Sequence, residues 1–226
     1  MPRVIIFDII GTLVDLQALE PYFERFFGDA AVRKEWFMQT LQLAMAATLT
    51  NAYEDFGVQV DTGLEITARH YKVSMLGEEK NLILSTLRKL RPYPEVAQSL
   101  QCLRDAGLRL ATLTNSTAEA AEAQLAYAGL RDHFEQVIST DEIHCFKPAQ
   151  EVYHLAARRM GVEPEQVRMV TAHDWDVTGA LRAGCAAVFI VRPGQVMNPF
   201  GPQPDMSGSD LGEVAEKLLA VEVGQG

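Results

Sequence analysis

A single carboxylate follows an apolar run near the start of the chain, in the stretch VIIFDIIGTLVD at residues 4–15. Asp8 ends this run, and Gly11 and Thr12 come shortly behind it. A glycine here permits a tight turn, so the carboxylate would point from a strand end into a cleft. A carboxylate in such a position can act as a nucleophile that forms a covalent intermediate. The pattern predicts a catalytic Asp8, with the Thr12 hydroxyl available to a carboxylate or a substrate oxygen.

Three more groups of polar residues have types that suit catalysis. Thr114 and Asn115 end a second apolar run, a pattern that also fits a helix N-cap. Lys147 lies between an apolar residue and a proline, so we expect it to be buried and to balance charge. Asp176, three residues after His173, is expected to orient Lys147 or a hydrolytic water, although it too could cap a helix.

The elements that must position these residues alternate between strands and helices. Short apolar segments predict strands at 4–8, 108–115, 135–140, 167–173 and 186–191, and helical patterns between them predict helices at 94–106, 116–128, 149–160 and 176–183. This alternation predicts βαβ units and a mainly parallel sheet. Such sheets bind ligands at the carboxyl ends of their strands, near a topological switch point. Asp8, Thr114 and the segment 171–174 all fall at such ends.

One long segment interrupts the alternation. Residues 16–90 contain no convincing strand, and their apolar spacing predicts helices at 35–49, 64–74 and 80–90. We therefore expect an all-helical cap domain at 16–90 over an α/β core domain made of residues 1–15 and 91–226. The segment 192–210 is rich in glycine and proline and is expected to be an ordered surface loop, before a last helix at 211–221.

The composition of the chain limits the classes of binding partner that we expect. The formal net charge of −10 argues against a nucleic-acid binder, which needs a basic face. No run reaches the ~18 apolar residues of a membrane span, and Asp8 interrupts the first apolar run, so we expect neither a membrane partner nor a signal peptide. Three cysteines without CxxC spacing suit a reducing cytoplasm. We expect a cytoplasmic protein with a small-molecule substrate; the apolar residues of 35–49 are compatible with a homodimer.

Taken together, the motifs resemble the haloacid dehalogenase superfamily. FDxxGTL at 7–13, Thr114-Asn115, Lys147-Pro148 and the pair Asp174/Asp176 follow the order and spacing of the four motifs of that superfamily. The resemblance covers almost the whole chain. It implies a Rossmann-like core with helices on both faces of a parallel sheet, and an Asp8 nucleophile that forms an ester or phospho-ester intermediate.

Most members of this superfamily are magnesium-dependent phosphatases, and this chain departs from them twice. The residue two places after the nucleophile is an aspartate in phosphatases, but here it is Ile10, which cannot act as a general acid. Thr171 stands about where phosphatases carry a metal-binding aspartate, and loss of one carboxylate weakens a magnesium site. We therefore expect no metal and no cofactor. Mg²⁺ would be needed only under the alternative of a phosphatase for a small phosphate ester, with Asp174 and Asp176 helping Asp8 to bind it.

The type II (S)-2-haloacid dehalogenase branch is the more similar one. MVTAHDWDVTGALRAG at 169–184, KPAQEVY at 147–153 and GPQPD at 201–205 resemble segments of that branch. The resemblance implies a metal-independent hydrolase in which Asp8 displaces a leaving group from carbon of a small 2-substituted carboxylic acid, such as a 2-haloacid. Water then hydrolyses the covalent ester. Lys147 and Asp176 would support the charge and the water, and His173, at the place of an asparagine, would be a general base or a hydrogen-bonded neighbour.

The expected substrate contacts come from both parts of the chain. The residues assigned to them are Ile9, Thr12, Thr114, Asn115, Tyr153, Thr171 and Trp175 from the core, and Phe37 and Phe56 from the cap. Thr12, Thr114 and Asn115 would hold the substrate carboxylate, partly through backbone N–H groups at a helix start. Phe56 and Trp175 would wall the alkyl group, although such aromatics also build ordinary cores.

Two departures from the branch concern the leaving group. Phe37, directly after Trp36, stands where the branch has an arginine that meets the halide, and Arg33 is the nearest substitute, one helical turn earlier. Ile10 also replaces an aromatic hydroxyl. These changes leave open a non-halide leaving group, for example on a strained-ring amino acid. A non-catalytic binding member of the family is a further alternative, against which the retained Asp8 and Lys147 count.

Overall fold

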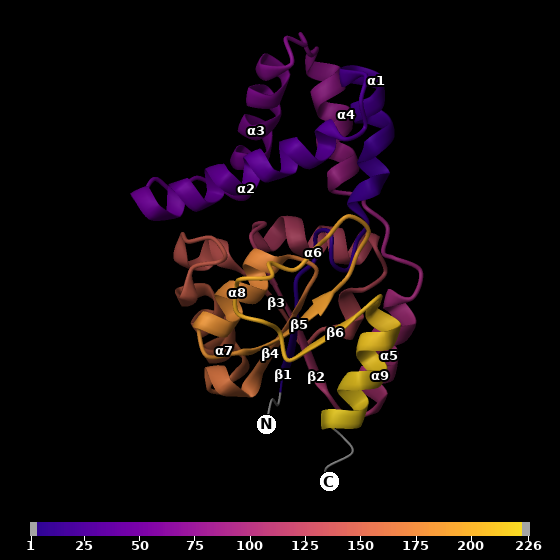
Figure 1. Cartoon of the computed structure of the whole chain (residues 1–226), viewed down its shortest axis with the longest axis vertical. Coiled ribbons are helices and arrows are strands. Elements are labelled where there is room, and N and C mark those ends of the chain that lie inside the picture. The colour runs from indigo at the N-terminus through magenta and orange to yellow at the C-terminus, as the bar shows by residue number, and fades with distance from the viewer. Residues whose placement is uncertain (1–3, 223–226) are drawn as a thin grey trace.

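A six-stranded parallel sheet forms the centre of the core in the computed structural model, which describes residues 4–222 (Figure 1). Its strands are β1 (Val4–Phe7), β2 (Arg109–Thr114), β3 (Gln136–Ser139), β4 (Val167–Thr171), β5 (Ala186–Ile190) and β6 (Met206–Gly208). They lie in the order β3-β2-β1-β4-β5-β6, and every neighbouring pair is parallel. The strand order reverses at β1, so the carboxyl ends of β1, β2 and β4 meet at a topological switch point.

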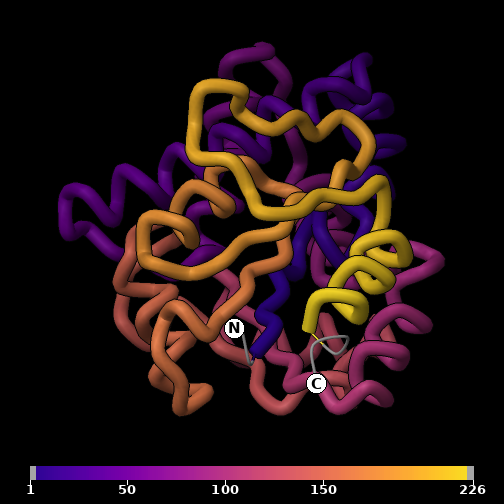
Figure 2. Tube along the Cα trace, turned by 60° about the horizontal axis from the view of Figure 1, so that its bottom comes forward, coloured from indigo at the N-terminus to yellow at the C-terminus, as the bar shows by residue number. Residues whose placement is uncertain are grey.

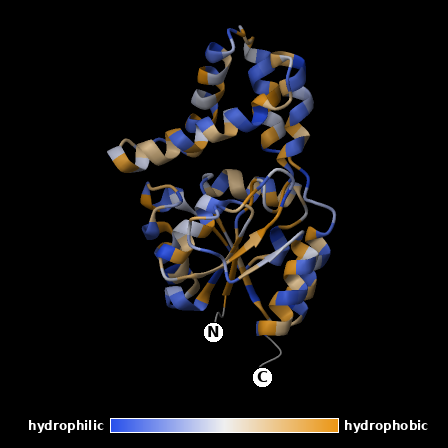
Figure 3. Cartoon of the chain, in the orientation of Figure 1, coloured by the Kyte–Doolittle hydropathy of each residue, from blue (hydrophilic) through white to orange (hydrophobic). Residues whose placement is uncertain are grey.

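Helices cover both faces of this sheet because successive strand side chains point to opposite faces. Ile5 and Phe7 of β1 belong to one apolar cluster, and Val4 and Ile6 belong to another. The first cluster contains side chains of α5 (Val96–Asp105), α6 (Ala118–Tyr127) and α9 (Leu211–Glu222), and the second those of α7 (Gln150–Met160) and α8 (Asp174–Arg182). Figure 3 shows the strands as mainly hydrophobic and the helices as mixed. The predicted α/β core with helices on both faces is confirmed.

A layer of helices stands beyond the carboxyl edge of the sheet (Figure 1). After a 3₁₀ turn at Leu16–Leu19, it consists of α1 (Glu20–Phe27), α2 (Val32–Thr50), α3 (Phe56–His70) and α4 (Gly77–Leu87). The Trp36 indole N–H of α2 donates to the Val60 carbonyl of α3 at 3.2 Å, and the Trp36 ring packs on Phe23 of α1. Further 3₁₀ turns lie in the core at Arg131–His133, Thr140–Ile143 and Pro164–Gln166.

The chain passes between the two layers twice, and the two passages are paired with each other. The Asp15 N–H donates to the Arg91 carbonyl at 2.9 Å, and the Tyr93 N–H donates to the Leu13 carbonyl at 3.1 Å. Val14 and Pro92 form an isolated bridge between these bonds. The passages therefore lie side by side, a few residues beyond Asp8.

Several elements differ from the expectation. The segment 192–210, expected to be a loop, contains β6, whose three residues are too few to give an alternating pattern. The rest of the β5–β6 connection, gold in Figure 2, reaches the helical layer, where a side chain at Gly194 would meet the Lys34 ammonium. Helix α1 was not expected, and α3 starts earlier than expected because the Asp55 side chain accepts the N–H groups of its first turn.

Helix α8 likewise begins at Asp174, two residues before its expected start. Among residues 4–222, no helix is both long enough and apolar enough to cross a lipid bilayer.

Candidate active site

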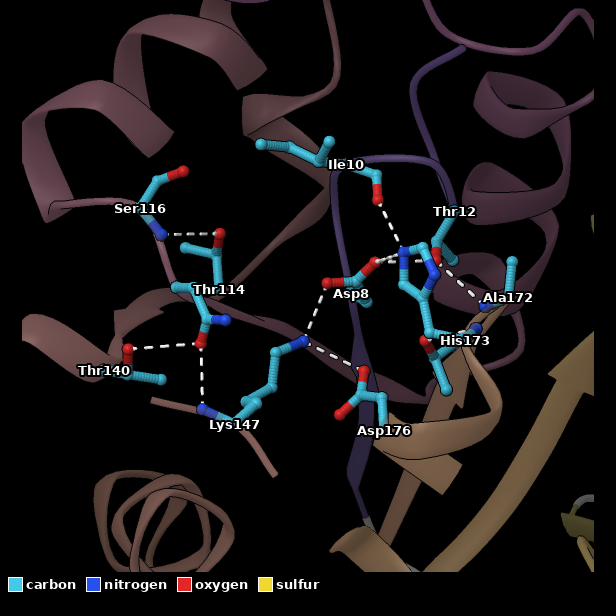
Figure 4. A network of polar contacts seen from close by, with 12 residues as sticks. Asp8, Ile10, Thr12, Thr114, Ser116, Thr140, Lys147, Ala172, His173 and Asp176 are labelled. Atoms are coloured by element: carbon cyan, nitrogen blue, oxygen red, sulfur yellow. Dashed lines mark hydrogen bonds and ion pairs between the residues drawn. The ribbon is translucent and has the colours of Figure 1, made fainter. Parts of the chain in front are cut away.

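Asp8 lies directly after β1, with each of its carboxylate oxygens in contact with a different group (Figure 4). Oδ1 accepts a hydrogen bond from Lys147 Nζ at 2.7 Å, and Oδ2 accepts one from the Thr12 hydroxyl at 2.7 Å. The His173 Nε2 lies 3.4 Å from Oδ2. Only 5% of Asp8 is exposed, so these partners, and not bulk water, set the orientation of its carboxylate.

The turn after Asp8 requires a glycine for two reasons. Gly11 has a φ of +80°, a left-handed conformation that other residues rarely adopt. A Cβ at this position would also come within 3.2 Å of the His173 ring. The Gly11 N–H donates to the Val14 carbonyl at 3.0 Å, which closes the turn. The glycine therefore allows both the turn and the approach of His173 to Asp8.

Lys147 joins Asp8 to a second carboxylate. Its ammonium donates to Asp176 Oδ2 at 2.9 Å, and the Tyr153 hydroxyl donates to Asp176 Oδ1 at 2.7 Å. The backbone N–H of Lys147 donates to Asn115 Oδ1 at 3.0 Å, so the end of β2 fixes the start of the lysine side chain. Lys147 and Asp176 are almost completely buried. One cation is thus held between two carboxylates out of contact with solvent.

The charges of this cluster stabilise one another. Burial disfavours the ionised form of Asp8, but Lys147 and His173 outweigh it and hold the pKa of the Asp8 carboxyl well below its usual value. Burial likewise disfavours the Lys147 ammonium, but Asp176 and Asp8 outweigh it and raise the pKa of Lys147. Asp8 is therefore an anion and Lys147 a cation over the ordinary pH range. The Asp8 carboxylate is therefore ionised and held in one orientation by Lys147 and Thr12.

His173 contacts both the nucleophile and the turn behind it. Because a carbonyl only accepts, Nε2 donates to the Ile10 carbonyl at 2.9 Å. The imidazole stacks on Trp175 with ring centroids 5.0 Å apart. Burial disfavours the charged imidazole, but the hydrogen bond and the negative charge of Asp8 outweigh it and raise the pKa of His173. The Asp8 carboxylate therefore favours the charged form of His173 relative to a free imidazole.

This raised pKa predicts how His173 contributes to stability at different pH. When a group has a higher pKa in the folded than in the unfolded state, its protonation stabilises the folded protein. For a histidine this contribution is complete below the unfolded pKa of about 6.5 and is lost as the pH rises through the folded pKa. The loss of unfolding free energy in His173→Gln should therefore be larger at about pH 6 than at about pH 9. Urea denaturation measures it, with the exposed His70→Gln as the control. A loss independent of pH would mean that His173 stays neutral.

Gly179 of α8 permits the contact that holds Asp176. A Cβ at this position would lie 2.5 Å from the Tyr153 hydroxyl and 2.7 Å from the Pro148 carbonyl oxygen. Gly179→Ala should therefore displace Tyr153 or part α7 from α8, at a cost of about 1–3 kcal/mol in unfolding free energy, together with a loss of turnover. Tyr153→Phe removes only the hydroxyl bond to Asp176 and should cost about 1 kcal/mol.

The matched control is Gly77→Ala in α4, where a Cβ would meet nothing within 4 Å. Alanine has the higher helix propensity, so Gly77→Ala should cost nothing or slightly stabilise the protein. An equal change in unfolding free energy for Gly77→Ala and Gly179→Ala in urea denaturation would show that the Tyr153 contact does not set the effect.

Several predicted site residues line one small cavity of about 20 Å³. Its lining consists of Asp8, Ile10, Phe37, Leu41, Phe56, Thr114, Asn115, Lys147, His173 and Trp175. Phe37 and Phe56 come from the helical layer, and the others, Leu41 apart, come from the core. The structure thus brings together the ends of β1, β2 and β4, the Lys147 segment and the first turn of α8. Asp176 lies behind Lys147 and does not line the cavity.

Four predicted substrate contacts have other partners. The Ile9 side chain is fully buried in the core, so only its backbone N–H, directly after Asp8, is left for a substrate. Thr171 is buried and accepts the His173 N–H, and Tyr153 is committed to Asp176. The Thr12 hydroxyl donates to Asp8 and accepts the Ala172 N–H. The hydroxyl groups of Thr12, Tyr153 and Thr171 thus have partners within the protein, and their contact with a substrate stays a prediction.

Arg33, the nearest substitute for the missing arginine, does not face the cavity. Its Nη2 donates to Glu20 Oε1 at 3.1 Å within the helical layer. Phe37 lines the cavity instead, with its ring centroid 6.0 Å from that of His173. The cations that line the cavity are Lys147 and His173.

Sequence reasoning missed Arg192, which supports the turn after Asp8. Its Nε and Nη2 both donate to the Thr12 carbonyl, at 3.1 and 2.9 Å, and its Nη1 donates to Glu95 at 2.6 Å. The guanidinium also lies 3.7 Å above the Tyr93 ring. The feature of the sequence that could have indicated it is a cation placed soon after the end of an apolar strand. Arg192 therefore holds the residue whose hydroxyl orients Asp8.

The donor set around Asp8 does not fit the magnesium ion of related phosphatases. The ammonium of Lys147 contacts both the Asp8 and the Asp176 carboxylate, so these oxygens already have a cationic partner. Magnesium prefers several hard oxygen ligands in near-octahedral geometry. Within residues 4–222, no three histidine, cysteine or acidic side chains gather as a metal site would require.

An aspartate at the switch point of a parallel sheet, paired with a buried lysine under a helical layer, is an arrangement suited to a hydrolase. The model of the haloacid dehalogenase-like hydrolase family matches residues 2–184, and the chain belongs to this family. The chain is 30% identical to an (S)-2-haloacid dehalogenase of Pseudomonas sp. strain YL over 94% of its own length and 92% of that protein. It is 28% identical to haloacetate dehalogenase H-2 of Moraxella sp. strain B, over 90% and 92%.

The comparison with a solved structure agrees with this family assignment. An L-2-haloacid dehalogenase from Xanthobacter autotrophicus, with chloropropionic acid covalently bound, matches 98% of this chain and 99% of its own. The TM-score is 0.89 and the sequence identity is 26%. The predicted Rossmann-like fold, the predicted family and the hydrolase class are confirmed.

Proposed function

We propose that this protein is a metal-independent hydrolase that displaces a leaving group from C2 of a small 2-substituted carboxylic acid, with a 2-haloacid as the main candidate. The observation that carries the proposal is the Lys147 ammonium, 2.7 Å from Asp8 and 2.9 Å from Asp176. It ionises and orients the nucleophile without a metal. The similarity to the named dehalogenases supports attack at carbon.

In the first step, an Asp8 carboxylate oxygen attacks C2 from the side opposite the leaving group. A new C–O bond forms, the bond to the leaving group breaks, and the leaving group departs with the electron pair. A halide leaves as a stable anion, so no general acid is required, and Ile10 in place of an acid is no obstacle. The product of this step is an ester between Asp8 and the substrate.

In the second step, water attacks the ester carbonyl carbon of Asp8. Ester formation removes the negative charge of Asp8, which is what raises the pKa of His173. The imidazole then loses its proton more easily and can accept one from the attacking water. Cleavage of the ester restores the Asp8 carboxylate and releases the 2-hydroxy acid, with one proton and one leaving-group anion formed per turnover.

The substrate carboxylate is assigned to the end of β2 and the start of α6. Thr114 and Asn115 line the cavity, and α6 begins at Ala118 close by. Backbone N–H groups at a helix start favour an anion, and the Ile9 N–H adds a donor next to the nucleophile. This placement would hold C2 near Asp8, with the alkyl group against Phe56 and Trp175.

Phe37 favours a second candidate within the same chemistry. Its apolar ring lines the cavity where the branch has an arginine for the halide. A leaving group that needs no cation, as on a strained ring, would suit this wall. Under that candidate, Asp8 and Lys147 keep their roles and only the leaving group changes.

The test is halide release from (S)-2-chloropropionate by the purified protein in the presence of EDTA, beside p-nitrophenyl phosphate with Mg²⁺. We expect release that EDTA does not reduce and no comparable phosphate release. Release that EDTA abolishes, or phosphate turnover alone, would refute the proposal and restore the magnesium-dependent phosphatase. If neither halide nor phosphate is released, the result would favour the candidate with a leaving group other than halide.

We also infer a small-molecule substrate, a cytoplasmic location and a homodimer. Free Cys102, Cys145 and Cys185 support the reducing compartment. Met38 and Leu49 of α2, 60% and 83% exposed, support a second copy covering that helix. Sedimentation velocity tests the dimer, and Leu49→Glu should weaken it.

A further inference from the structure

A second, larger cavity adjoins the catalytic cavity. It has a volume of about 360 Å³ and lies between α3 and α4 of the helical layer and the first turns of α6. Ile10 and Phe56 line both cavities, so the two meet at these side chains. We call the larger one the distal cavity. Ser116 and Thr117, just before α6, also line it, next to the place proposed for the substrate carboxylate, and the rest of its lining has no role in the proposed function.

The sizes of the two cavities limit what each can hold. A single water needs about 10–15 Å³ of such volume, so the catalytic cavity of about 20 Å³ has room for little more than the reacting centre. Sites for small organic ligands usually span about 300–1,000 Å³, a range that includes the distal cavity. Any substrate part beyond the first carbons must therefore extend past Ile10 and Phe56.

The walls of the distal cavity indicate the chemistry of that part. Its apolar residues are Ile10, Phe56, Val60, Leu84, Leu87, Ala120 and Ala123. The lining has one basic residue, Arg88, and two acidic residues, Asp55 and Glu119, so it carries more negative than positive charge. The Asp55 carboxylate already accepts the N–H groups of Gly57 and Val58. Such a lining favours an alkyl chain over a second carboxylate.

Ile10 also gains a role in this arrangement. It lies at the junction of the two cavities and is only 8% exposed. A chain that leaves C2 toward the distal cavity would pass its aliphatic side chain, which neither accepts nor donates a hydrogen bond. Ile10, which has neither an acid nor a hydroxyl group, therefore provides apolar contact area for the passing chain.

We propose that the distal cavity binds the alkyl chain of the substrate beyond C2, and that the substrates are 2-substituted alkanoic acids of about six carbons or more. The inference rests on the proposed function for the chemistry at C2 and adds the substrate class. Each methylene that the cavity buries should raise kcat/KM by up to about fourfold. Three additional methylenes should therefore raise it by at least about tenfold, since burial is incomplete.

The kinetic test compares (S)-2-chloropropionate with (S)-2-chlorohexanoate. We expect kcat/KM for halide release to be at least about tenfold higher for the longer acid. Ala123→Phe places a ring in the distal cavity and should lower this ratio by about fivefold or more. The control is Ala126→Phe, on the same helix and exposed but outside the cavity lining, which should leave the ratio unchanged. Equal kcat/KM values for both acids, or equal effects of the two variants, would overturn the assignment.

A binding measurement separates this inference from the proposed function. Hexanoate and propionate carry no leaving group, so calorimetric titration of the unmodified protein measures their binding without turnover. We expect hexanoate to bind about tenfold more tightly or better. This preference without halide release would uphold the distal cavity and refute the halide reaction. Halide release without either preference would uphold the reaction and refute the distal cavity.

Discussion

Asp8→Asn is expected to lower the rate of halide release by at least about 10⁴-fold, because an amide has no anionic oxygen to attack carbon. Asparagine has nearly the shape of aspartate; its oxygen can still accept from Lys147 and its amide can donate to the Thr12 hydroxyl oxygen, so the far-UV circular dichroism should stay that of the wild type. The control is Asp61→Asn, an exposed carboxylate of α3. A variant that keeps more than about a tenth of the activity would show that Asp8 is not the nucleophile.

Isotope labelling gives an independent test of whether Asp8 attacks C2. In a single turnover in H₂¹⁸O with enzyme in excess, water attacks the ester carbonyl, so the label should appear in Asp8 and not in the 2-hydroxy acid. Mass spectrometry of the peptide that contains Asp8 detects a gain of one ¹⁸O. Label in the hydroxy acid during this first turnover would mean that water attacks C2 directly and that Asp8 acts as a base.

Lys147→Met is expected to cost both stability and activity. The buried carboxylates of Asp8 and Asp176 would lose the cation between them, and breaking a buried ion pair from one side costs about 3–5 kcal/mol. The double variant Lys147→Met/Asp176→Asn removes one of the two charges and should regain part of the unfolding free energy, without regaining turnover. The control is the exposed Lys89→Met, which should change the unfolding free energy by less than about 0.5 kcal/mol.

The cost of Lys147→Met should also depend on pH. The pKa of Asp8 is lowered in the folded protein, so its contribution to stability is present above its unfolded pKa and is lost as the pH falls toward the folded pKa. The stability difference between wild type and Lys147→Met should therefore be smaller at about pH 3 than at about pH 7. Urea denaturation at both values measures it. A difference that grows as the pH falls would contradict the ion-pair account.

Much of the fold follows from local patterns in the sequence. The five longer strands are apolar runs that end in polar or glycine-containing segments, and rules for parallel sheets then place the ends of β1, β2 and β4 together. β6 escapes this reasoning because Met206–Gly208 pairs only with β5 and has too few residues for a period. Helix α1 has an aromatic-rich sequence with Pro21 in its first turn, and its buried residue, Phe23, packs on Trp36 of a helix that follows it in the chain.

The site could be predicted at the level of residue types and less well at the level of partners. That Asp8, Lys147 and Asp176 would gather follows from their places at the ends of strands and in the loops beyond them. Which hydroxyl serves which carboxylate depends on rotamers and helix packing, so Tyr153 and Thr12 were assigned to substrate although they bind Asp176 and Asp8. Arg192 acts through a backbone carbonyl, and a sequence pattern does not specify such a contact.

The paired passages between the two layers have a mechanical consequence. Two chain segments joined by backbone hydrogen bonds at Asp15–Arg91 and Leu13–Tyr93 behave as a single short ribbon. Because the two passages are tied together, any movement of the helical layer relative to the sheet would have to change the backbone angles of both passages at once. Such a movement would change the separation between Phe56 of α3 and the catalytic edge of the core. The paired passages begin a few residues after Asp8. A change in the position of the helical layer would therefore act on the turn that orients the Asp8 carboxylate.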